Sequence, residues 1–352
     1  MKSLILDINF AKTHVNFNTE FLKAINHHSD IIIVDDNESY GTPQNTNYIY
    51  IKSKLIYKFT KNSILSRVFM LVNFVKSYRS VSLIGADKVF YLNHDIVVLF
   101  FCLFFVPKKV KKSIYLVHHK HIDELNNNIK LRLFNSYKNQ VNHIVLADYI
   151  KNHLINDIKV NENFVFTCNH PIYNRHKKIS ITDSKNPTTF VSLSISSDER
   201  IIEEIINNKK LNDVLNDLNI KLYIKSKIYN HETSNLKVFN NFLDENSYNS
   251  LYNNCSGVLL LLDKAFEYRI SGTMIDALSL GKIIISTNTS CAQFYSKDYP
   301  NMVKISYNTD DLIRKLKKNI LNEPQLLEDH KRFLINNSLN NLSTQFKYIF
   351  HD

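Results

Sequence analysis

Short strand patterns alternate with helical patterns along most of this chain, and this alternation constrains the fold more than any other feature of the sequence. The strand-like runs include SLILDI near the N-terminus, KVFYLN at 88–93 and GVLLLL at 257–262. Helical spacing separates such runs, for example at 19–26 and 198–207. Strands joined through helices form parallel sheets with right-handed crossovers. We therefore expect an α/β fold with ligands at the carboxyl ends of the strands.

The length and one polar stretch predict two domains. A chain of 352 residues exceeds what one hydrophobic core usually covers. The alternation is interrupted from His176 to Thr189 by a polar segment that contains Pro187, as expected of a linker. We therefore expect a Rossmann-like N-terminal domain at 1–175, a linker at 176–188, a Rossmann-like C-terminal domain at 189–335 and a final helix at 336–352.

The segment EYRISGTMIDALSLGKIIISTN, from Glu267 to Asn288, contains two of only five glycines in the chain. It has the pattern of a loop, a glycine turn, a helix, a glycine stop and a buried strand. Gly272 follows Ser271 at the expected helix N-terminus, where unpaired N–H groups and the helix dipole favour an anion such as a diphosphate. Gly281 is expected to end the helix in a left-handed conformation. The pattern therefore predicts an anion site followed by a parallel strand.

This segment resembles the donor-nucleotide segment of family 4-like GT-B glycosyltransferases of bacterial polysaccharide and lipopolysaccharide biosynthesis. NHPIY at 169–173 resembles the His-Pro segment that commonly ends the first domain in that family, and the resemblance covers roughly residues 141 to 295. It implies a GT-B fold, in which two Rossmann-like domains with parallel sheets face a central cleft. It also implies that the helix at 336–352 crosses back to the N-terminal domain.

The resemblance implies roles for the acids and the arginine of this segment. Asp276 stands where the family has the acid that hydrogen-bonds the ribose hydroxyls, a charge-assisted contact. The family has another acid eight positions earlier, which is Tyr268 here, and Glu267 is one residue away. Arg269 is expected to contact the diphosphate, because guanidinium matches phosphate oxygens. The alternative is an ordinary ion pair between Glu267 and Arg269.

Basic residues after other strands of the second domain are further candidates for phosphate ligands. Arg200 follows the first strand, with a plain helix-surface role as the alternative, and Lys225 or Lys227 follows the next. Positive side chains and helix N–H groups can stabilise a leaving diphosphate without a metal, and no Asp-x-Asp pair has a convincing context, so we expect metal independence and no cofactor. The expected donor-binding residues are Arg200, Lys225, Lys227, Arg269, Ser271, Gly272, Thr273 and Asp276.

Histidines and one aspartate follow two strands of the first domain. HHKHID places His118 and His119 after a buried strand, and similar transferases use a histidine there to contact the donor sugar. Metal binding by this segment is an alternative, but it lacks a recognised zinc spacing. Asp95 could deprotonate the acceptor hydroxyl or simply cap a helix. The expected catalytic residues are His118, His119, Asp95 and Glu267, and no metal ligand is assigned.

Basic charge and apolar helices coincide in the N-terminal half. Residues 1–172 carry 21 Lys and Arg against 13 Asp and Glu, whereas the remainder carries 23 against 20. The apolar run Ile96 to Val106 precedes PKKVKK, and apolar residues recur at helical spacing from Ile64 to Val75. This combination suits an anionic membrane surface, although the same helix could pack on the sheet. Without a recognised nucleic-acid motif, we expect no nucleic-acid partner.

The sequence thus predicts a hexosyl- or related glycosyltransferase that transfers a sugar from a nucleoside-diphosphate sugar to a carbohydrate or lipid-linked acceptor. The resemblance implies retention of configuration and a role in bacterial capsule or lipopolysaccharide assembly. MKSLILDINF reaches Asp7 before a signal-peptide core develops, so we expect a cytoplasmic protein, peripheral on the membrane. The alternatives are a sugar-nucleotide epimerase of similar fold and a catalytically inactive, membrane-associated binding subunit.

Overall fold

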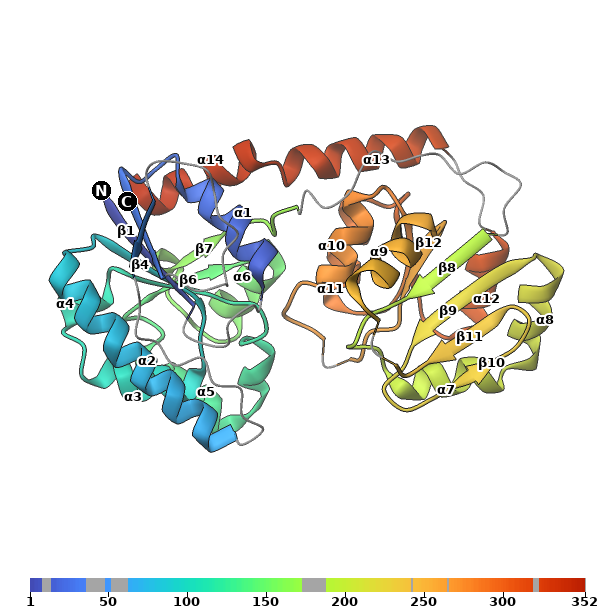
Figure 1. Cartoon of the computed structure of the whole chain (residues 1–352), viewed down its shortest axis with the longest axis horizontal. Helices are drawn as coiled ribbons and strands as arrows, with labels where there is room; N and C mark the ends of the chain where they lie inside the picture. Colours follow the sequence, from blue (N-terminus) through green and yellow to red (C-terminus); the bar gives the residue numbers. More distant parts are fainter. Residues whose placement is uncertain are drawn as a thin grey trace. The chain divides into compact units, whose positions relative to one another are not determined.

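The chain forms two compact α/β units, each described here by itself (Figure 1). The computed structural model describes residues 1–7, 14–35, 48–51, 63–172, 188–241, 243–264, 266–318 and 323–351. The first unit comprises Met1–Pro171, Tyr268–Ile270 and Asn336–Asp352, and the second comprises Ile172–Glu267 and Ser271–Ile335. Of the expected linker at 176–188, only Thr188 is among the described residues.

The first unit contains a seven-stranded sheet in which every pairing is parallel. Its order is β3-β2-β1-β4-β5-β6-β7, so sheet growth reverses direction between β1 and β4, where ligands of such sheets commonly bind. The strands are β1 (Lys2–Asp7), β2 (Ile31–Asp35), β3 (Tyr48–Ile51), β4 (Lys88–Asn93), β5 (Ile114–Val117), β6 (Asn142–Val145) and β7 (Val165–Thr167).

Helices cover both faces of this sheet (Figure 1). They are α1 (Val15–Ile25), α2 (Ser63–Ile84), α3 (Ile96–Phe104), α4 (Lys108–Lys111), α5 (Asn128–Tyr137), α6 (Asp148–Asn156) and α14 (Leu339–His351), with 3-10 turns at Asp123–Asn126 and Glu162–Phe164. The sequence predicts one helix from Leu125 to Tyr137, but Asn127 is extended and its side chain caps α5, so a 3-10 turn and a helix form instead.

The C-terminal helix belongs to the core of the first unit. α14 packs beside α1, and the ring of Phe346 meets that of Phe21 edge-on with centroids 4.9 Å apart. Phe21 in turn contacts Phe90 of the central strand β4 at 6.0 Å. All three rings are buried. Helix α14 therefore completes the hydrophobic layer on this face of the first sheet.

The second unit contains another seven-stranded sheet, with the order β10-β11-β9-β8-β12-β13-β14. Its strands are parallel except for the short antiparallel edge strand β10. They are β8 (Thr188–Ser192), β9 (Ile220–Lys225), β10 (His231–Glu232), β11 (Leu236–Phe239), β12 (Gly257–Leu260), β13 (Ile283–Thr287) and β14 (Val303–Ser306). The direction of growth reverses between β8 and β12, which places the loop after β12 at a position where ligands commonly bind.

The helices of the second unit are α7 (Glu199–Asn207), α8 (Lys209–Asp217), α9 (Glu245–Asn254), α10 (Gly272–Ser279), α11 (Ser290–Asp298), α12 (Thr309–Lys317) and most of α13 (Glu323–Asn336). One core layer joins α7, α8 and α12 to the sheet. It contains Phe190, Leu211, Leu222 and Leu316 among other buried side chains. Such continuous apolar strands are typical of a parallel sheet covered on both faces.

Gly257 allows a close approach between neighbouring strands. A Cβ at this position would lie 2.3 Å from Cε1 of the buried Phe190 ring and 3.0 Å from the Ile283 carbonyl oxygen. We expect Gly257→Ala to lower the free energy of unfolding by about 1–3 kcal/mol, because the added methyl overpacks the core. Urea unfolding measures the change. Gly272→Ala is the matched control, since a Cβ there meets nothing within 4 Å, and an equal loss in both variants would contradict the prediction.

The expected geometry of the helix between the two motif glycines is confirmed. Ser271 caps α10, since its side-chain oxygen accepts a hydrogen bond from the Met274 N–H. Gly281 has a φ of 65°, its N–H donates to the Leu278 carbonyl, and the next N–H donates to the Ala277 carbonyl. This is a Schellman motif, which favours glycine at the left-handed position.

Candidate active site

The loop after β12 and the start of α11 meet at the carboxyl edge of the second sheet. The Glu267 carboxylate accepts a hydrogen bond from the hydroxyl of Ser290, the first residue of α11. Strand β13, which precedes α11, pairs with β12 in parallel, so both residues follow neighbouring strands at the same edge. Glu267 is therefore placed at the sheet edge where ligands of parallel sheets bind.

The N-terminus of α10 opens at the same edge. Its cap satisfies the Met274 N–H, while the N–H groups of Gly272 and Thr273 have no hydrogen-bond acceptor among the residues described. Gly272 is exposed, and Asp276 lies one turn further along the helix, partly buried. The Asp276 charge also contributes to the raised pKa of Tyr252, after the dominant effect of burial. Free N–H groups, the helix dipole and a nearby carboxylate suit a ligand that carries both a diphosphate and hydroxyl groups.

Arg200 lies close to this edge but is already paired. Its Nε and Nη2 lie 3.1 and 2.7 Å from the two carboxylate oxygens of Asp198, the cap of α7. This pair holds the pKa of Asp198 below its usual range, mainly through the hydrogen bond from Arg200 and with a smaller contribution from Lys264. The Asp198 N–H donates to the Leu261 carbonyl at 2.7 Å, which joins this loop to the one after β12. Lys264, an exposed lysine in that loop, was not identified from the sequence.

The two lysines after β9 have different environments. Nζ of Lys225 donates to the main-chain carbonyls of Ser226 and Asn240, both at 2.6 Å. Lys225 thus ties the ends of β9 and β11 together, a structural role. Lys227 is exposed, and its backbone N–H donates to the Glu199 carboxylate. Of the two, Lys227 is the one whose ammonium group faces solvent.

Arg269 does not pair with Glu267, the alternative considered from the sequence. Its Nε lies 2.8 Å from an oxygen of Asp123, and both residues belong to the first unit. The neighbouring Tyr268 stacks on His153 at 3.5 Å between centroids, and the Arg269 carbonyl accepts from the Tyr149 hydroxyl at 2.9 Å. Tyr268 stands where the resembling family has its first acid. The structure therefore gives Tyr268 a packing role, and the neighbouring acid Glu267 contacts Ser290 at the edge of the second sheet.

Of the residues expected to be catalytic in the first unit, Asp95 is already hydrogen-bonded within the protein and His118 is buried. One oxygen of Asp95 accepts the N–H groups of Val97 and Val98, the helix-cap role, and Nε of Arg67 lies 3.4 Å from the other. His118 is only 2 % exposed, so its ring is inside the unit and does not line an open surface. His119 is partly exposed, and its ring stacks on His14 at 4.5 Å.

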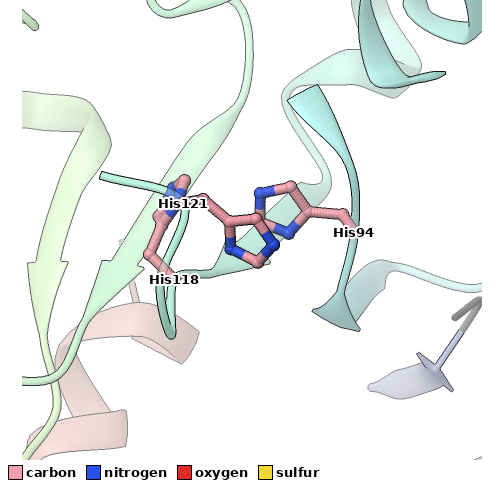
Figure 2. Close-up of side chains that lie close together, drawn as sticks. All are labelled: His94, His118 and His121. Atoms are coloured by element: carbon pink, nitrogen blue, oxygen red, sulfur yellow. The ribbon is translucent and has the colours of Figure 1, made fainter. Parts of the chain in front are cut away.

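A cluster of buried histidines surrounds His118. Metal binding by the segment with His118, His119, His121 and Asp123 was an alternative from the sequence, but the proximity of His94 was not predicted. His94 follows β4 and His121 follows β5, and these strands are neighbours in the sheet. The side chains of His94, His118 and His121 converge inside the unit (Figure 2). Burial is the largest cause of the lowered pKa of each ring. The sequence signal that could have found the cluster is the pair of histidine-containing loops after two adjacent strands.

His170, from the NHPIY segment, makes the stability of the first unit sensitive to acid. Burial lowers the pKa of His170 to about 4, while a hydrogen bond to the Pro171 carbonyl opposes this effect. The unfolded chain binds this proton below about pH 6.5, so stability is lost as the pH falls from about 6.5 to 4. At pH 5 the loss from this group is about 2 kcal/mol. Urea unfolding at pH 7.5 and 5 should show a correspondingly smaller loss in His170→Gln, and an unchanged pH dependence would contradict this assignment.

The two parallel sheets and their strand orders define the GT-B fold, and solved structures of glycosyltransferases share it along almost the whole chain. HepE of Anabaena, solved with UDP-glucose, has a TM-score of 0.66 at 11 % identity, covering 100 % of this chain and 99 % of that one. A glycosyltransferase of Rickettsia africae has a TM-score of 0.58 at 13 % identity, covering 99 % and 97 %.

WaaG, a glycosyltransferase involved in lipopolysaccharide biosynthesis, has a TM-score of 0.60 at 11 % identity, and the match covers 99 % of each chain. The sequence matches no protein-family model, and no curated protein is significantly similar to it. At these identities the likeness establishes the fold, and the expected GT-B architecture is confirmed.

Proposed function

We propose that this protein is a glycosyltransferase that moves a sugar from a nucleoside-diphosphate sugar to a carbohydrate or lipid-linked acceptor. The observation that carries the proposal is the edge of the second sheet, where the open N-terminus of α10, Asp276 and Glu267 lie on consecutive parts of one loop and helix. The GT-B fold supports it, because HepE of the same fold is solved with UDP-glucose. By the same comparison, a UDP-sugar is the first donor to test.

In the proposed reaction, the bond between the sugar C1 and the phosphate oxygen breaks, and C1 forms a new bond to the acceptor oxygen with net retention. The diphosphate leaves with the bonding electrons, and its charge is stabilised by the N–H groups of Gly272 and Thr273 together with Lys227 and Arg200. The transfer itself needs no metal. For retention in a single step, the acceptor oxygen attacks on the face that the diphosphate leaves, and its proton passes to the departing diphosphate oxygen.

The experiment is donor turnover measured with and without acceptor. Purified protein is incubated with UDP-glucose and other nucleotide sugars, alone and with a bacterial lipid extract, and the released nucleotide is measured while NMR follows the sugar. The proposal predicts nucleotide release that rises when acceptor is added. Isomerisation of the donor sugar without an acceptor would instead identify an epimerase.

One observation favours a second candidate, a catalytically inactive binding subunit. Tyr268 replaces the first acid of the resembling family and packs on His153. In this case the protein would bind nucleotide weakly or not at all and release none from any donor. A single round of turnover above the level of a Glu267→Gln variant would exclude this candidate.

We also propose that the protein acts at an anionic membrane, in the assembly of surface polysaccharide. One surface of the first unit supports this location. Phe101, Phe104 and Phe105, at the end of α3, are 54, 77 and 80 % exposed. Lys108, Lys109 and Lys112 follow and are also exposed, whereas Lys111 of the same cluster is buried and donates to Gln140. Aromatic rings beside ammonium groups match the interfacial region of an anionic bilayer.

Helix α2 extends the apolar character of this region. It packs against α3, and its exposed side chains include Ile64, Val68 and Val75, while Met70 and Phe74 are buried. If α2 packed on the sheet through its apolar face, these side chains would be buried. Most of them are exposed instead. Within the described parts of the chain, no helix is long and apolar enough to cross a membrane.

We expect the double variant Phe104→Ser/Phe105→Ser to bind vesicles of phosphatidylcholine and phosphatidylglycerol about tenfold or more weakly than the parent, because two inserted rings are lost. Co-sedimentation measures the binding, and added salt should weaken it through the lysines. The control is Ile129→Ser, another exposed apolar residue of this unit at 69 %. Equal binding by all three proteins would rule out this surface.

A further inference from the structure

We propose that His94, His118 and His121 form a binding site for a divalent transition-metal ion, for which Zn²⁺ is the best match. The three residues are 2, 2 and 1 % exposed, and one ligand nitrogen from each lies within 4.8 Å of the others. Figure 2 shows the three side chains close together. They come from the loops after β4 and β5, so two adjacent strands of a rigid parallel sheet position all three.

Several ring nitrogens at this site have no hydrogen-bond partner. Among the described residues, neither ring nitrogen of His94 is paired, and Nδ1 of His118 is also unpartnered. The His121 ring has a polar contact with the His94 backbone. A buried polar group without a partner costs about 1–3 kcal/mol. The rings of His94 and His121 are stacked, with their centroids 3.8 Å apart. A metal ion that accepts one lone pair from each histidine would satisfy one nitrogen of each ring.

A chain of hydrogen bonds fixes the tautomer of His118 that a metal requires. Nε2 of His143 lies 2.8 Å from the Lys138 carbonyl, which can only accept, so His143 donates from Nε2 and keeps a lone pair on Nδ1. Nε2 of His118 lies 2.9 Å from that Nδ1 and must therefore donate to it. In the neutral ring this leaves the lone pair of His118 on Nδ1, the unpartnered atom at the site. His143 is thus a positioning residue for the ligand His118.

The distances require a small closure. Nitrogens bound to one tetrahedral Zn²⁺ are about 3.4 Å apart, so the widest pair must approach by about 1.4 Å, which side-chain rotation can provide. Three histidines and one water complete a four-coordinate zinc site. Mg²⁺ and Ca²⁺ prefer oxygen ligands, so a site made of three imidazoles favours a transition metal such as Zn²⁺ over either of them. The site lies in the interior of the first unit, so a metal that binds only the folded chain stabilises that unit.

The test is metal binding by tag-free, full-length protein. After chelator treatment and dialysis, the protein is titrated with Zn²⁺ in competition with a chromophoric chelator, and with Co²⁺ while visible absorption is recorded. We expect one equivalent of Zn²⁺ per chain, a higher melting temperature with Zn²⁺, and d–d absorption of low-coordinate Co²⁺. No stoichiometric binding by the folded protein would overturn the proposal.

Matched variants locate the site. His94→Gln and His118→Gln should each lose at least tenfold in Zn²⁺ affinity, whereas His170→Gln, a buried histidine outside the three, should bind as the parent does. His143→Leu should retain one equivalent with about 10–100-fold weaker affinity, because the tautomer of His118 is no longer fixed. Circular dichroism confirms folding of each variant. Unchanged affinity in folded His94→Gln and His118→Gln would overturn the proposal, even if another site binds metal.

Discussion

Phe346→Ala is expected to lower the free energy of unfolding by about 3–5 kcal/mol, the largest loss of stability predicted for this chain. The Phe346 ring is fully buried and meets Phe21 at 4.9 Å. Its removal leaves a cavity between α14, α1 and the first sheet. Although Phe346 lies near the end of the sequence, the cost is that of a central core residue, because α14 belongs to the first unit.

Urea unfolding of Phe346→Ala and Tyr348→Ala measures this effect. Tyr348 lies on the same helix but is 67 % exposed, so its removal should change stability by no more than about 0.5 kcal/mol. The difference between the two variants reports the packing of α14 and cancels any change in helix propensity common to both. If both variants lose the same small amount, α14 does not pack on the first unit as described.

Asp276→Ala is expected to weaken nucleoside-diphosphate binding by about 1–3 kcal/mol, which corresponds to a 5- to 150-fold higher Kd. In the proposed complex its carboxylate accepts hydrogen bonds from ribose hydroxyls, and such bonds to a charged group are stronger than neutral ones. Asp276 lies one turn from the open N-terminus of α10. One nucleotide can therefore place its diphosphate at this N-terminus and its ribose at the Asp276 carboxylate. Only nucleotides with an intact ribose should show the full loss.

Isothermal titration with UDP measures the effect of Asp276→Ala. The control is Asp217→Ala, which removes the same charge from the exposed end of α8 in the same unit and should bind as the parent does. Asp276→Asn should lose less than Asp276→Ala, because an amide can still accept one hydrogen bond. Unchanged affinity in folded Asp276→Ala would remove this residue from the donor site.

The sequence predicted those parts of the fold that local chemistry determines. Ser271 and Gly281 mark the two ends of α10 because a cap hydroxyl and a left-handed position have few alternatives. The alternation of strands and helices correctly indicated two parallel sheets. Strands β3, β10, β11 and β14 were not predicted, and each of them has at most four residues.

Tertiary partners could not be predicted, because they depend on the order of strands in each sheet. The pairing of Arg269 with Asp123 joins residues 146 positions apart in the sequence. The convergence of His94 on His118 and His121 requires that β4 and β5 be neighbours. Likewise, the sequence did not distinguish the buried Lys111 from the exposed lysines beside it, since that difference arises from the contact with Gln140.

The most direct test of the proposed donor site is a thermal-shift screen of the purified protein against UDP, GDP, ADP, TDP and CMP, with Asp276→Ala measured in parallel. A ligand that binds only the folded state at 100 times its Kd stabilises it by about 2.7 kcal/mol. The account predicts a clear rise in melting temperature with one nucleoside diphosphate, and a much smaller rise in Asp276→Ala at the same concentration. No rise with any of the nucleotides, in a parent protein that melts cooperatively, would contradict the proposed donor site.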